Sequence, residues 1–424
     1  MKRRTLLSGL SGILAAGLAP GLWQRSFAAD PEKKRRVVIA GGGFAGAKTA
    51  VDLKRLVPDA EILLIEPEER FFSAPSSLDV AFGRIPMASA SRSYDLLARK
   101  GIRLIKGRVL GADPVTHNVE TSQGSFAYSA LVAASGIDLV PEAIEGLKGE
   151  NALSNLSLYD RKRLPDLAKA IADFKGGTIV VSAPAGAIKC APAPYEYTLL
   201  LAHHLKSRGL KGKVVLIDDR PNPQPQSVAS GFSAAMEAMG PYIDYLFQET
   251  VARVDVKKRE VETGMGDKIA YDLLTLIPPN RGSALVKTLG IAGQGDSFAE
   301  VDPTTMKCAA HEAVYAVGDA ARTPYGISAS SSTQGALLCA AAVADSFGVR
   351  QPEITASAPA RIQTVCYPFA GPELSMRTVS RFQVHMDKGE MKLHSDPDIE
   401  AKGTPVNLAA RRKWEDDLLA SIFG

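Results

Sequence analysis

The chain has few cysteines and tryptophans, and its body contains no long apolar run. Four cysteines and two tryptophans occur in 424 residues, which is far below the cysteine content of a small disulfide-stapled scaffold. The sequence contains no Cys-x-x-Cys-His, so this chain does not itself attach a c-type haem. Beyond residue 29 no segment approaches 18 uninterrupted apolar residues. The sequence therefore predicts no integral membrane anchor in the mature protein.

Net charge is also nearly absent. Lys and Arg outnumber Asp and Glu by 50 to 46, and Lys2, Arg3, Arg4 and Arg25 account for that excess. A formally neutral body argues against nucleic-acid binding. With 46% apolar and 23% charged residues, the composition is that of a folded protein of two or three domains.

Residues 1–29 have the pattern of an export signal. A charged start, Lys2 to Arg4, precedes a weakly apolar, Gly-rich stretch, and small residues near Ala29 suit a cleavage site. The paired arginines favour the twin-arginine route, which exports folded proteins, and so predict a periplasmic location. An uncleaved membrane anchor is the alternative, which Pro20 and the glycines of this stretch disfavour.

A glycine-rich turn follows the first strand expected after the signal. Gly41 permits a tight turn, Gly43 lets the backbone approach a pyrophosphate, and Gly46 lets the next helix lie close to the strand. Glu66, at the end of the following strand, is placed to bind an adenosine ribose. The pattern predicts a βαβ unit that binds FAD or NAD at a helix N-terminus. Its expected elements are a strand at 35–41, a helix at 47–56 and a strand at 61–65.

Gly318-Asp319 favours FAD over NAD. This pair follows a buried strand at 314–317 and precedes a helix expected at about 330–346. A Gly-Asp pair after a buried strand, far downstream of the glycine turn, is the second signature of FAD-binding flavoproteins of the disulfide-reductase type. The helix places its N-terminus near the flavin, where a positive dipole end stabilises negative charge.

A second α/β unit follows, with strands at 178–181 and 214–218 and a helix at 195–207. Its turn at 182–187 lacks the glycine pattern, so this unit is predicted to keep the fold without binding NAD. We predict an α/β protein with two Rossmann-like domains, as in disulfide reductases, and a C-terminal α+β element. The expected FAD-binding domain comprises 30–150 and 290–350, the degenerate second domain 151–289, and the C-terminal interface element 351–424.

Two of the four cysteines lie in loops where chemistry is expected. Cys190 directly follows a strand and precedes a helix, and Cys366 lies in the irregular C-terminal region. Cys339, in an apolar helix, is typical of a small buried hydrophobe, and Cys308 has no clear role. A structural disulfide or two unrelated thiols remains the alternative for Cys190 and Cys366. No metal site is predicted.

Several motifs together carry a family resemblance: Val37–Gly46, Leu64–Pro67, Cys190–Glu196, Leu276–Pro279, Gly318-Asp319, Cys366-Tyr367 and Trp414–Gly424. On these segments nearly all of the mature chain resembles the flavoprotein subunit of flavocytochrome c sulfide dehydrogenase, a relative of sulfide:quinone oxidoreductases. The resemblance implies that Cys190 and Cys366 form a redox-active disulfide beside FAD. We expect Cys366 to be the sulfur nearer the flavin. It also implies that Glu196 is a base that takes a proton from H₂S. A carboxylate favoured at a helix N-terminus is the alternative for Glu196.

One departure concerns the cofactor. Members of this family typically hold FAD covalently through a cysteine shortly after the second-strand acid, but no cysteine occurs between Glu66 and Cys190. We therefore expect FAD to be bound non-covalently.

The C-terminal segment bears on the electron acceptor. Residues 411–417 are too charged for the amphipathic membrane-docking helix of quinone-linked relatives, so a c-type cytochrome on another chain is the expected acceptor. Trp414 is a candidate aromatic between flavin and acceptor, or simply a packed tryptophan. Two alternatives remain: a sulfide:quinone oxidoreductase or related sulfur-pathway flavoprotein, and a non-catalytic assembly factor that keeps the flavin fold.

Overall fold

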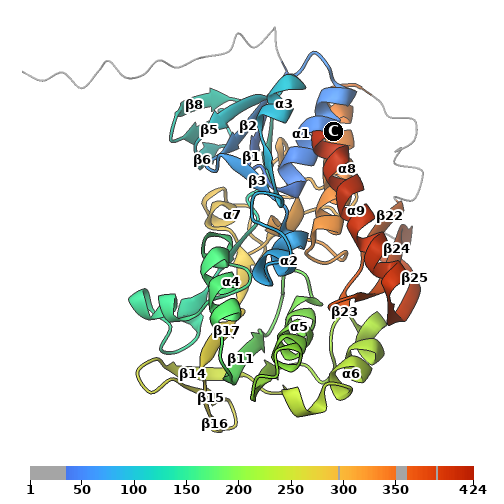
Figure 1. The fold of residues 1–424 in the computed structure, drawn as a ribbon. Coiled ribbons are helices and arrows are strands. Elements are labelled where there is room, and N and C mark those ends of the chain that lie inside the picture. The colour runs from blue at the N-terminus through green and yellow to red at the C-terminus, as the bar shows by residue number, and fades with distance from the viewer. Residues whose placement is uncertain (1–34, 295–296, 350–360, 388–389) are drawn as a thin grey trace, which may run out of the picture.

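The computed structural model describes residues 35–294, 297–349, 361–387 and 390–424 (Figure 1). The predicted export signal at 1–29 lies outside the described residues. Two parallel sheets form the two halves of the molecule, the first in the upper half of Figure 1 and the second in the lower half. A third, antiparallel sheet and a long helix, formed by the end of the chain, lie at one side of both.

The first sheet is parallel and has helices on one face. Its strands, in spatial order, are β20 (Val314–Ala316), β9 (Ala130–Ala133), β1 (Arg36–Ala40), β2 (Glu61–Glu66) and β5 (Arg103–Lys106). Val37 and Ile39 pack toward α1 (Phe44–Leu56) and α8 (Ala329–Ser346), whereas Val38 packs on the opposite face. This alternation follows from the two-residue period of a strand. The burial of each such side chain contributes roughly 2 kcal/mol to folding.

A small antiparallel sheet covers the opposite face of the first sheet. It consists of β6 (Val109–Asp113), β7 (Asn118–Thr121) and β8 (Gly124–Ala127). Val119 and Phe126 of this sheet share a core with Leu63 and Leu131. The first sheet is therefore buried on both faces, as parallel sheets require.

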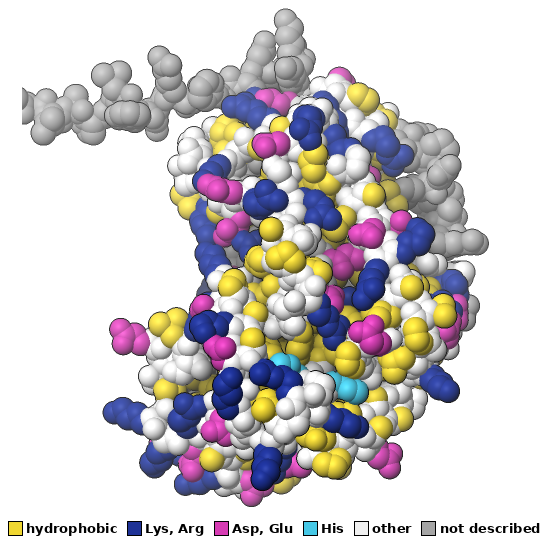
Figure 2. All heavy atoms as spheres, viewed as in Figure 1, with side chains coloured by type: hydrophobic (Ala, Val, Ile, Leu, Met, Phe, Trp, Pro, Cys, Tyr) yellow, Lys and Arg dark blue, Asp and Glu magenta, His cyan; other side chains and the backbone are white. Residues whose placement is uncertain are grey.

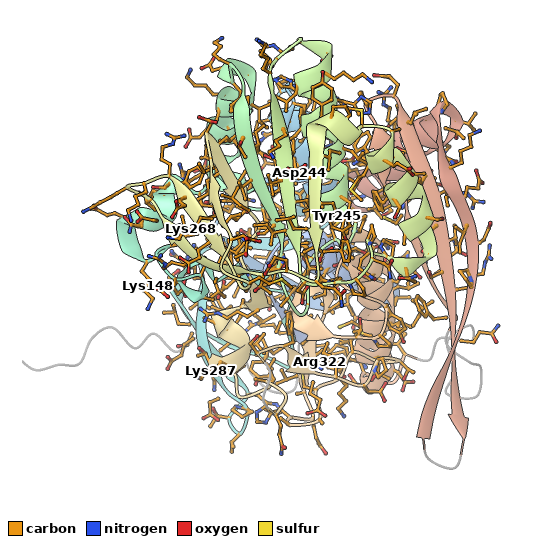
Figure 3. All side chains as sticks on the ribbon, turned by 90° about the horizontal axis from the view of Figure 1, so that it is seen from below. Lys148, Asp244, Tyr245, Lys268, Lys287 and Arg322 are labelled. Atoms are coloured by element: carbon orange, nitrogen blue, oxygen red, sulfur yellow. The ribbon has the colours of Figure 1, made fainter. Side chains whose placement is uncertain are left out.

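The second sheet repeats this arrangement. Its parallel strands are β13 (Ile243–Phe247), β12 (Gly212–Asp218), β11 (Gly177–Ala183) and β17 (Leu273–Leu276). One face packs on α4 (Leu164–Asp173), α5 (Ala193–Ser207) and α6 (Ala229–Glu237). The other packs on a small sheet of β14 (Val251–Asp255), β15 (Glu260–Thr263) and β16 (Lys268–Ala270). Asp244 and Tyr245, labelled in Figure 3, mark the edge strand β13.

The C-terminal region forms an antiparallel sheet and one long helix. The strands are β22 (Arg361–Cys366), β23 (Phe369–Gly371), β24 (Leu374–Asp387) and β25 (Glu390–Thr404), and α9 (Pro405–Phe423) follows. The β24–β25 ribbon lies at one side of the molecule in Figure 3. From there α9 runs back along the first domain and ends beside α1 (Figure 1).

Short elements connect these parts. They are α2 (Ser77–Ala81), α3 (Asp95–Arg99), α7 (Ala284–Thr288), β3 (Arg70–Phe72), β4 (Ser91–Ser93), β10 (Ile137–Leu139), β18 (Asn280–Gly282), β19 (Ala299–Glu300) and β21 (Ala321–Arg322). β10 and β18 pair antiparallel where the chain passes between the two halves.

The fold class predicted from the sequence is confirmed, and two details differ. The glycine turn enters α1 at Phe44 rather than at residue 47. Cys366 lies at the end of a regular strand rather than in irregular backbone.

Within the part of the chain that the structure describes, no helix is both long and apolar enough to span a membrane. On the face drawn in Figure 2, Lys and Arg side chains are interspersed with Asp and Glu, without a single basic patch. This surface agrees with the nearly neutral composition of the chain.

Candidate active site

A cavity of about 800 Å³, here called the central cavity, collects residues from all three parts of the chain. The first domain contributes the glycine turn and Glu66, and the second contributes Lys189, Cys190 and Glu196. The C-terminal region contributes Val365, Cys366, Tyr367, Arg411 and Trp414. The cavity lies at the carboxyl ends of the parallel strands of the first sheet, where α/β proteins bind ligands.

At one end of the cavity, the glycine turn has no room for side chains. Gly41 has φ +109°, and a Cβ there would lie 2.4 Å from the carbonyl oxygen of Ala134. A Cβ on Gly46 would lie 1.9 Å from the carbonyl oxygen of Gly41, so only glycine lets α1 approach the strand this closely. At Gly43, by contrast, a Cβ would meet open space. A ligand therefore has access to the backbone at this point.

The carboxylate of Glu66 braces this turn. Its Oε2 accepts from the backbone N–H of Gly42 at 2.6 Å, and its Oε1 accepts from the N–H of Glu68 at 2.9 Å. Tyr94 closes the turn from the other side by donating to the carbonyl oxygen of Gly42 at 3.0 Å. Gly41, Gly43, Glu66 and Tyr94 all line the cavity.

The cavity fits a dinucleotide such as FAD. The N-terminus of α1 opens on it at Gly43 without a side-chain cap or an acid in the first turn, which leaves the helix dipole for a phosphate. The N-terminus of α8 opens on it at Ser328–Ser330. Two helix N-termini that open on one cavity suit a ligand with negative charge at two places.

Asp319 connects the Gly-Asp motif to the second domain. Its Oδ2 pairs with Lys189 Nζ at 2.8 Å, and its Oδ1 accepts from Ser332 Oγ at 3.1 Å. The Asp319 carboxylate raises the pKa of Lys189, although burial alone would lower it. Gly318 has φ +73°, and a Cβ there would lie 2.5 Å from Ala45 Cβ, so this glycine allows the motif to pack on α1. This ion pair holds the ammonium of Lys189, the residue that precedes Cys190 in the sequence, in the cavity wall.

Cys190 is held by its backbone in a strained conformation. Its φ is +54°, which is uncommon for a residue with a side chain. Its N–H donates to the carbonyl oxygen of Ile327 at 2.7 Å, and its own carbonyl oxygen accepts from Tyr159 Oη at 3.2 Å. Tyr159 also donates to the carbonyl oxygen of Lys189. These contacts fix where the Cys190 side chain enters the cavity.

Cys366 reaches the same place from the C-terminal sheet. The N–H of Val365, its neighbour in β22, donates to Ser330 Oγ in the first turn of α8 at 2.9 Å. Cys190 is hydrogen-bonded to Ile327, and Val365, the neighbour of Cys366, is hydrogen-bonded to Ser330. Both cysteine segments are therefore held at the N-terminus of α8. Both are half-buried free thiols in the structure.

The electrostatics of the two thiols reflect this convergence. Burial, followed by the negative charge of Glu196, raises the pKa of Cys190 to about 12, against the opposing charges of Arg411 and Lys189. Burial also raises the pKa of Cys366 well above its ordinary value, and the neighbouring Cys190 raises it further. A reduced pair without thiolate stabilisation gives up its electrons more readily than a stabilised pair.

Glu196 lies in the first turn of α5 and is buried. Its Oε1 accepts from the N–H of Phe369 at 2.8 Å, which ties α5 to β23. Burial raises its pKa to about 7, although the charge of Arg411 and the Phe369 N–H lower it. A carboxyl group that titrates near neutrality beside two cysteines can exchange protons at working pH.

Arg411 and Glu415 of α9 close the cavity from the C-terminal side. Arg411 donates to the carbonyl oxygen of Pro75 at 2.8 Å and pairs with Asp79 at 3.3 Å. Its guanidinium also lies 4.1 Å from the ring centroid of Phe369. Glu415 accepts from the hydroxyls of Ser73, at 2.5 Å, and Ser76. The helix thus holds the segment before and within α2, part of which lines the cavity.

Comparisons with known proteins agree with this geometry. The family described as sulfide dehydrogenase [flavocytochrome c] flavoprotein chain, central, matches residues 165–278. The mitochondrial sulfide:quinone oxidoreductase of Mus musculus is 26% identical over 297 residues, which cover 68% of this chain and 66% of the mouse protein. A sulfide-quinone reductase of Aquifex aeolicus is 29% identical over 256 residues, 56% of this chain and 54% of that protein.

Among solved structures, the sulfide:quinone oxidoreductase from Aquifex aeolicus superposes with a TM-score of 0.71 at 20% identity. The match covers 92% of this chain and 91% of that one. In both sequence and fold, the chain therefore resembles sulfide:quinone oxidoreductases of the FAD-dependent disulfide-reductase type. It carries the central domain of the flavocytochrome c sulfide dehydrogenase flavoprotein. The alignments span less than two thirds of the two curated relatives, so the activity of this flavoprotein is a matter for proposal.

Most of the residues singled out from the sequence of this flavoprotein meet in the central cavity. Those that line it are Gly41, Gly43, Glu66, Cys190, Glu196, Asp319 and Cys366. Gly46 and Gly318 are not part of the lining, and both support it by allowing close packing. Trp414 lines the cavity with its ring centroid 6.3 Å from that of Tyr367.

Several residues that line or support the site were not predicted from the sequence: Tyr94, Tyr159, Lys189, Ser330, Arg411 and Glu415. For the last two a signal was present, because the buried positions 408, 411, 415, 419 and 422 of α9 follow a helical period. From the sequence, residues 411–417 were used only to argue against membrane docking. No local pattern marks Tyr159, whose contacts come from a distant loop.

The two other cysteines of this flavoprotein are buried in packing cores. Cys339 is fully buried within α8, and Cys308 is 2% exposed before β20. Neither lines the central cavity. Across the described ranges, no group of three or more His, Cys, Asp and Glu side chains is arranged to hold a metal ion.

Proposed function

We propose that this flavoprotein is an FAD-dependent sulfide dehydrogenase that oxidises sulfide through a disulfide between Cys190 and Cys366. One observation carries the proposal. Both cysteine segments are hydrogen-bonded to residues 327–330 at the N-terminus of α8, and both side chains line the dinucleotide cavity. Cysteines placed together only for stability would not need to face a cavity that fits FAD. The family of the chain, whose members include sulfide-oxidising flavoproteins, supports the same proposal.

The chemistry begins with the disulfide form. HS⁻ attacks one sulfur of the disulfide and breaks the S–S bond, which yields a persulfide on one cysteine and a thiolate on the other. A second HS⁻ attacks the outer sulfur of the persulfide, releases a disulfane and leaves both cysteines reduced. The dithiol then holds the two electrons removed from sulfide.

Three groups of the chain assist this exchange. Glu196 takes the proton of H₂S, which we assign to Oε2 because Oε1 accepts from the Phe369 N–H. The positive charges of Arg411 and Lys189 favour the thiolates against the burial that opposes them.

Bound FAD supplies the two-electron acceptor for the dithiol. Gly41, Gly43 and Glu66 would hold its adenosine and phosphate end, and Asp319 its ribityl side. We further propose that the cofactor is non-covalent. In the segment where a family member would carry the linking cysteine, this chain has Ser73, whose hydroxyl donates to Glu415.

We propose a c-type cytochrome of another chain as the electron acceptor, in the periplasm. The charged α9 and the predicted export signal at 1–29 support this choice. The rival acceptor is a quinone, which the names of the curated relatives favour. Anaerobically reduced protein should reduce a soluble c-type cytochrome in preference to a ubiquinone analogue. The reverse preference would assign the chain to the quinone-linked group.

Anaerobic titration of the FAD-loaded protein with sulfide tests the activity. Sulfide should bleach the flavin absorbance of the wild type in a stoichiometric manner. In Cys366→Ser and Cys190→Ser, the rate of bleaching should fall by at least about 100-fold, because no disulfide remains to be attacked.

Cys308→Ala is the matched control, since Cys308 lies outside the cavity, and it should bleach at the wild-type rate. A wild-type flavin that sulfide leaves oxidised would reject the proposal and favour a non-catalytic assembly factor.

A further inference from the structure

The loop that carries Cys190 is an expansion of a dinucleotide-binding turn. In the first domain, only Gly41–Gly43 separate β1 from α1. In the second domain, residues 184–192 separate the corresponding strand β11 from α5. The longer loop crosses to the central cavity and delivers Lys189 and Cys190 there. The segment that would bind the phosphates of a second dinucleotide instead reaches the redox site.

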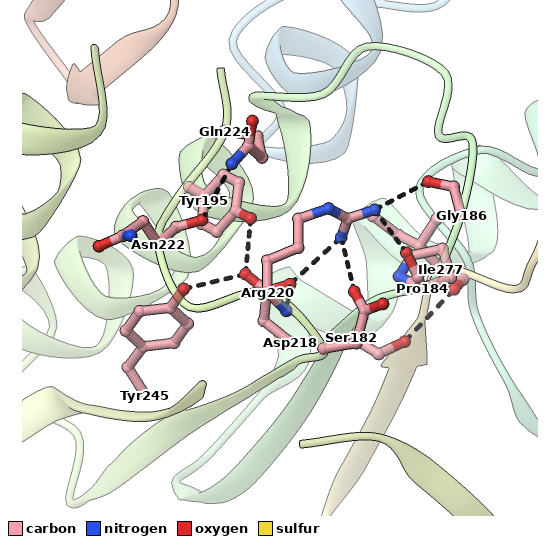
Figure 4. A network of polar contacts seen from close by, with 11 residues as sticks. Ser182, Pro184, Gly186, Tyr195, Asp218, Arg220, Asn222, Gln224, Tyr245 and Ile277 are labelled. Atoms are coloured by element: carbon pink, nitrogen blue, oxygen red, sulfur yellow. Dashed lines mark hydrogen bonds and ion pairs between the residues drawn. The ribbon is translucent and has the colours of Figure 1, made fainter. Parts of the chain in front are cut away.

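Arg220 contacts the start of this loop (Figure 4). Its Nη2 donates to the carbonyl oxygens of Pro184 and Gly186, each at 2.9 Å. Its Nη1 pairs with Asp218 Oδ1 at 3.2 Å and with Asp219 Oδ1 at 3.1 Å. One guanidinium thus joins the start of the Cys190 loop to the end of β12.

Asp218 is the counterpart of Glu66, since each is the last residue of the second strand of its unit. Unlike Glu66, Asp218 is fully buried. Its Oδ2 accepts from Tyr195 Oη at 2.6 Å and from Tyr245 Oη at 2.9 Å. The carboxylate that would bind a ribose is therefore committed to two phenols and Arg220, which fixes the arginine in turn.

Cys190 needs such support because its φ of +54° is sparsely populated. Strained residues persist only where several contacts over-determine them. The end of the loop is held by Tyr159 at Cys190, by the carbonyl oxygen of Ile327, and by Asn280 Oδ1, which accepts from the Lys189 N–H at 2.8 Å. Arg220 holds the beginning of the same loop.

We propose that Arg220 is a positioning residue for the redox disulfide. Its guanidinium clamps the 184–192 loop to the end of β12, so that Cys190 keeps the conformation in which it can pair with Cys366. The consequence for sulfide oxidation rests on the proposed function, whereas the positioning itself does not. Arginine suits the role because its planar fork serves two carbonyl oxygens and two carboxylates at once.

The test compares Arg220→Met and Arg220→Lys with a matched control, Arg253→Met. Arg253 lies in β14 of the same domain and pairs with Glu262 at 2.6 Å, away from the loop. In dithiothreitol-reduced, FAD-loaded protein, the alkylation rates of Cys190 and Cys366 by iodoacetamide are measured by peptide mass spectrometry. We expect Arg220→Met to alter the rate at Cys190 at least fivefold and the rate at Cys366 less than twofold. Arg220→Lys should give an intermediate change at Cys190, and Arg253→Met none.

The same proteins are then reoxidised and mixed with sulfide in a stopped-flow instrument. Flavin reduction should slow at least tenfold in Arg220→Met, less in Arg220→Lys, and not at all in Arg253→Met. Unchanged Cys190 alkylation in Arg220→Met that retains FAD would overturn the positioning role. If Arg220→Met fails to fold, a wild-type alkylation rate in Arg220→Lys overturns it instead. A wild-type flavin that ignores sulfide, with the alkylation differences present, would overturn only the proposed function.

Discussion

At the scale of single residues, the site depends on groups whose chemistry is set by what surrounds them. Glu196 is a carboxyl that burial brings to a pKa of about 7, and Cys190 is a thiol that burial brings to a pKa of about 12. In water a glutamate would be fully ionised at neutral pH, and the pKa of a cysteine thiol would be several units lower than that of Cys190. The cavity therefore turns an ordinary carboxyl group into a proton acceptor matched to neutral pH.

The raised pKa of Glu196 gives a pH dependence of known sign. As the base, Glu196 must be ionised, so its contribution to flavin reduction is absent below pH 7 and develops as the pH rises through about 7. The ratio of the wild-type rate to that of Glu196→Gln cancels the ionisation of sulfide itself. This ratio should rise with pH by about 30-fold in stopped-flow measurements between pH 5.5 and 8.5, because the ionised fraction of a group with a pKa of about 7 rises by that factor.

The glutamine keeps an oxygen that accepts from the Phe369 N–H, so FAD content and melting temperature serve as controls. A rate ratio independent of pH would show that Glu196 is only a buried helix-end carboxylate.

At the scale of elements, the two faces of α9 have different roles, which the charged composition of the helix does not predict. Its exposed face carries ion pairs such as Lys413 with Asp417 at 2.6 Å. Its inner face presents Arg411 and Glu415 to the segment 73–79, and Phe423 packs on Phe71 with ring centroids 4.8 Å apart. The helix α9 thereby holds the segment 73–79, which forms part of the cavity wall, against the first domain.

This clamp predicts that Glu415→Ala weakens both stability and cofactor retention. The substitution leaves the hydroxyls of Ser73 and Ser76 without their acceptor in a buried place, which costs about 1–3 kcal/mol. We expect a lower melting temperature by thermal denaturation and a several-fold faster release of FAD, followed by flavin fluorescence.

Asp417→Ala, on the exposed face of the same helix, is the control and should change neither quantity appreciably. Equal behaviour of the two variants would exclude a clamp.

At the scale of the whole molecule, the cavity exists only where three parts of the chain meet. The first domain provides the glycine turn, the second provides the Cys190 loop, and the C-terminal region provides Cys366 and α9. A ligand that contacts all three parts stabilises the folded state against unfolding by mass action.

Removal of FAD should therefore lower the melting temperature of the whole protein, and added FAD should restore it. Because the cofactor is proposed to be non-covalent, acid precipitation should release the flavin into the supernatant. Flavin that remains in the pellet would identify a covalent link. An unchanged melting temperature of the apoprotein would show that the cofactor does not connect the three parts.

The sequence by itself determined the features whose signal is local. The turn Gly41–Gly46, Glu66 and Gly318-Asp319 were recognisable because close backbone packing and a helix N-terminus require particular residues at short fixed spacings. The short, continuously apolar strands also indicated the fold class, since each strand of a parallel sheet is buried on both faces. The predicted pairing of Cys190 with Cys366 rests on the family resemblance alone.

The contacts between these distant parts of the chain are visible only in the folded structure. It brought both cysteine segments to Ile327–Ser330, turned Arg411 and Glu415 inward, and placed Arg220 at the base of the Cys190 loop. No short sequence pattern predicts these contacts, because each joins backbone or side-chain groups from strands and helices that are far apart in the sequence. Their physical reason is the packing of three parts around one cavity, where buried charges and carbonyl oxygens must find partners that the local sequence does not supply.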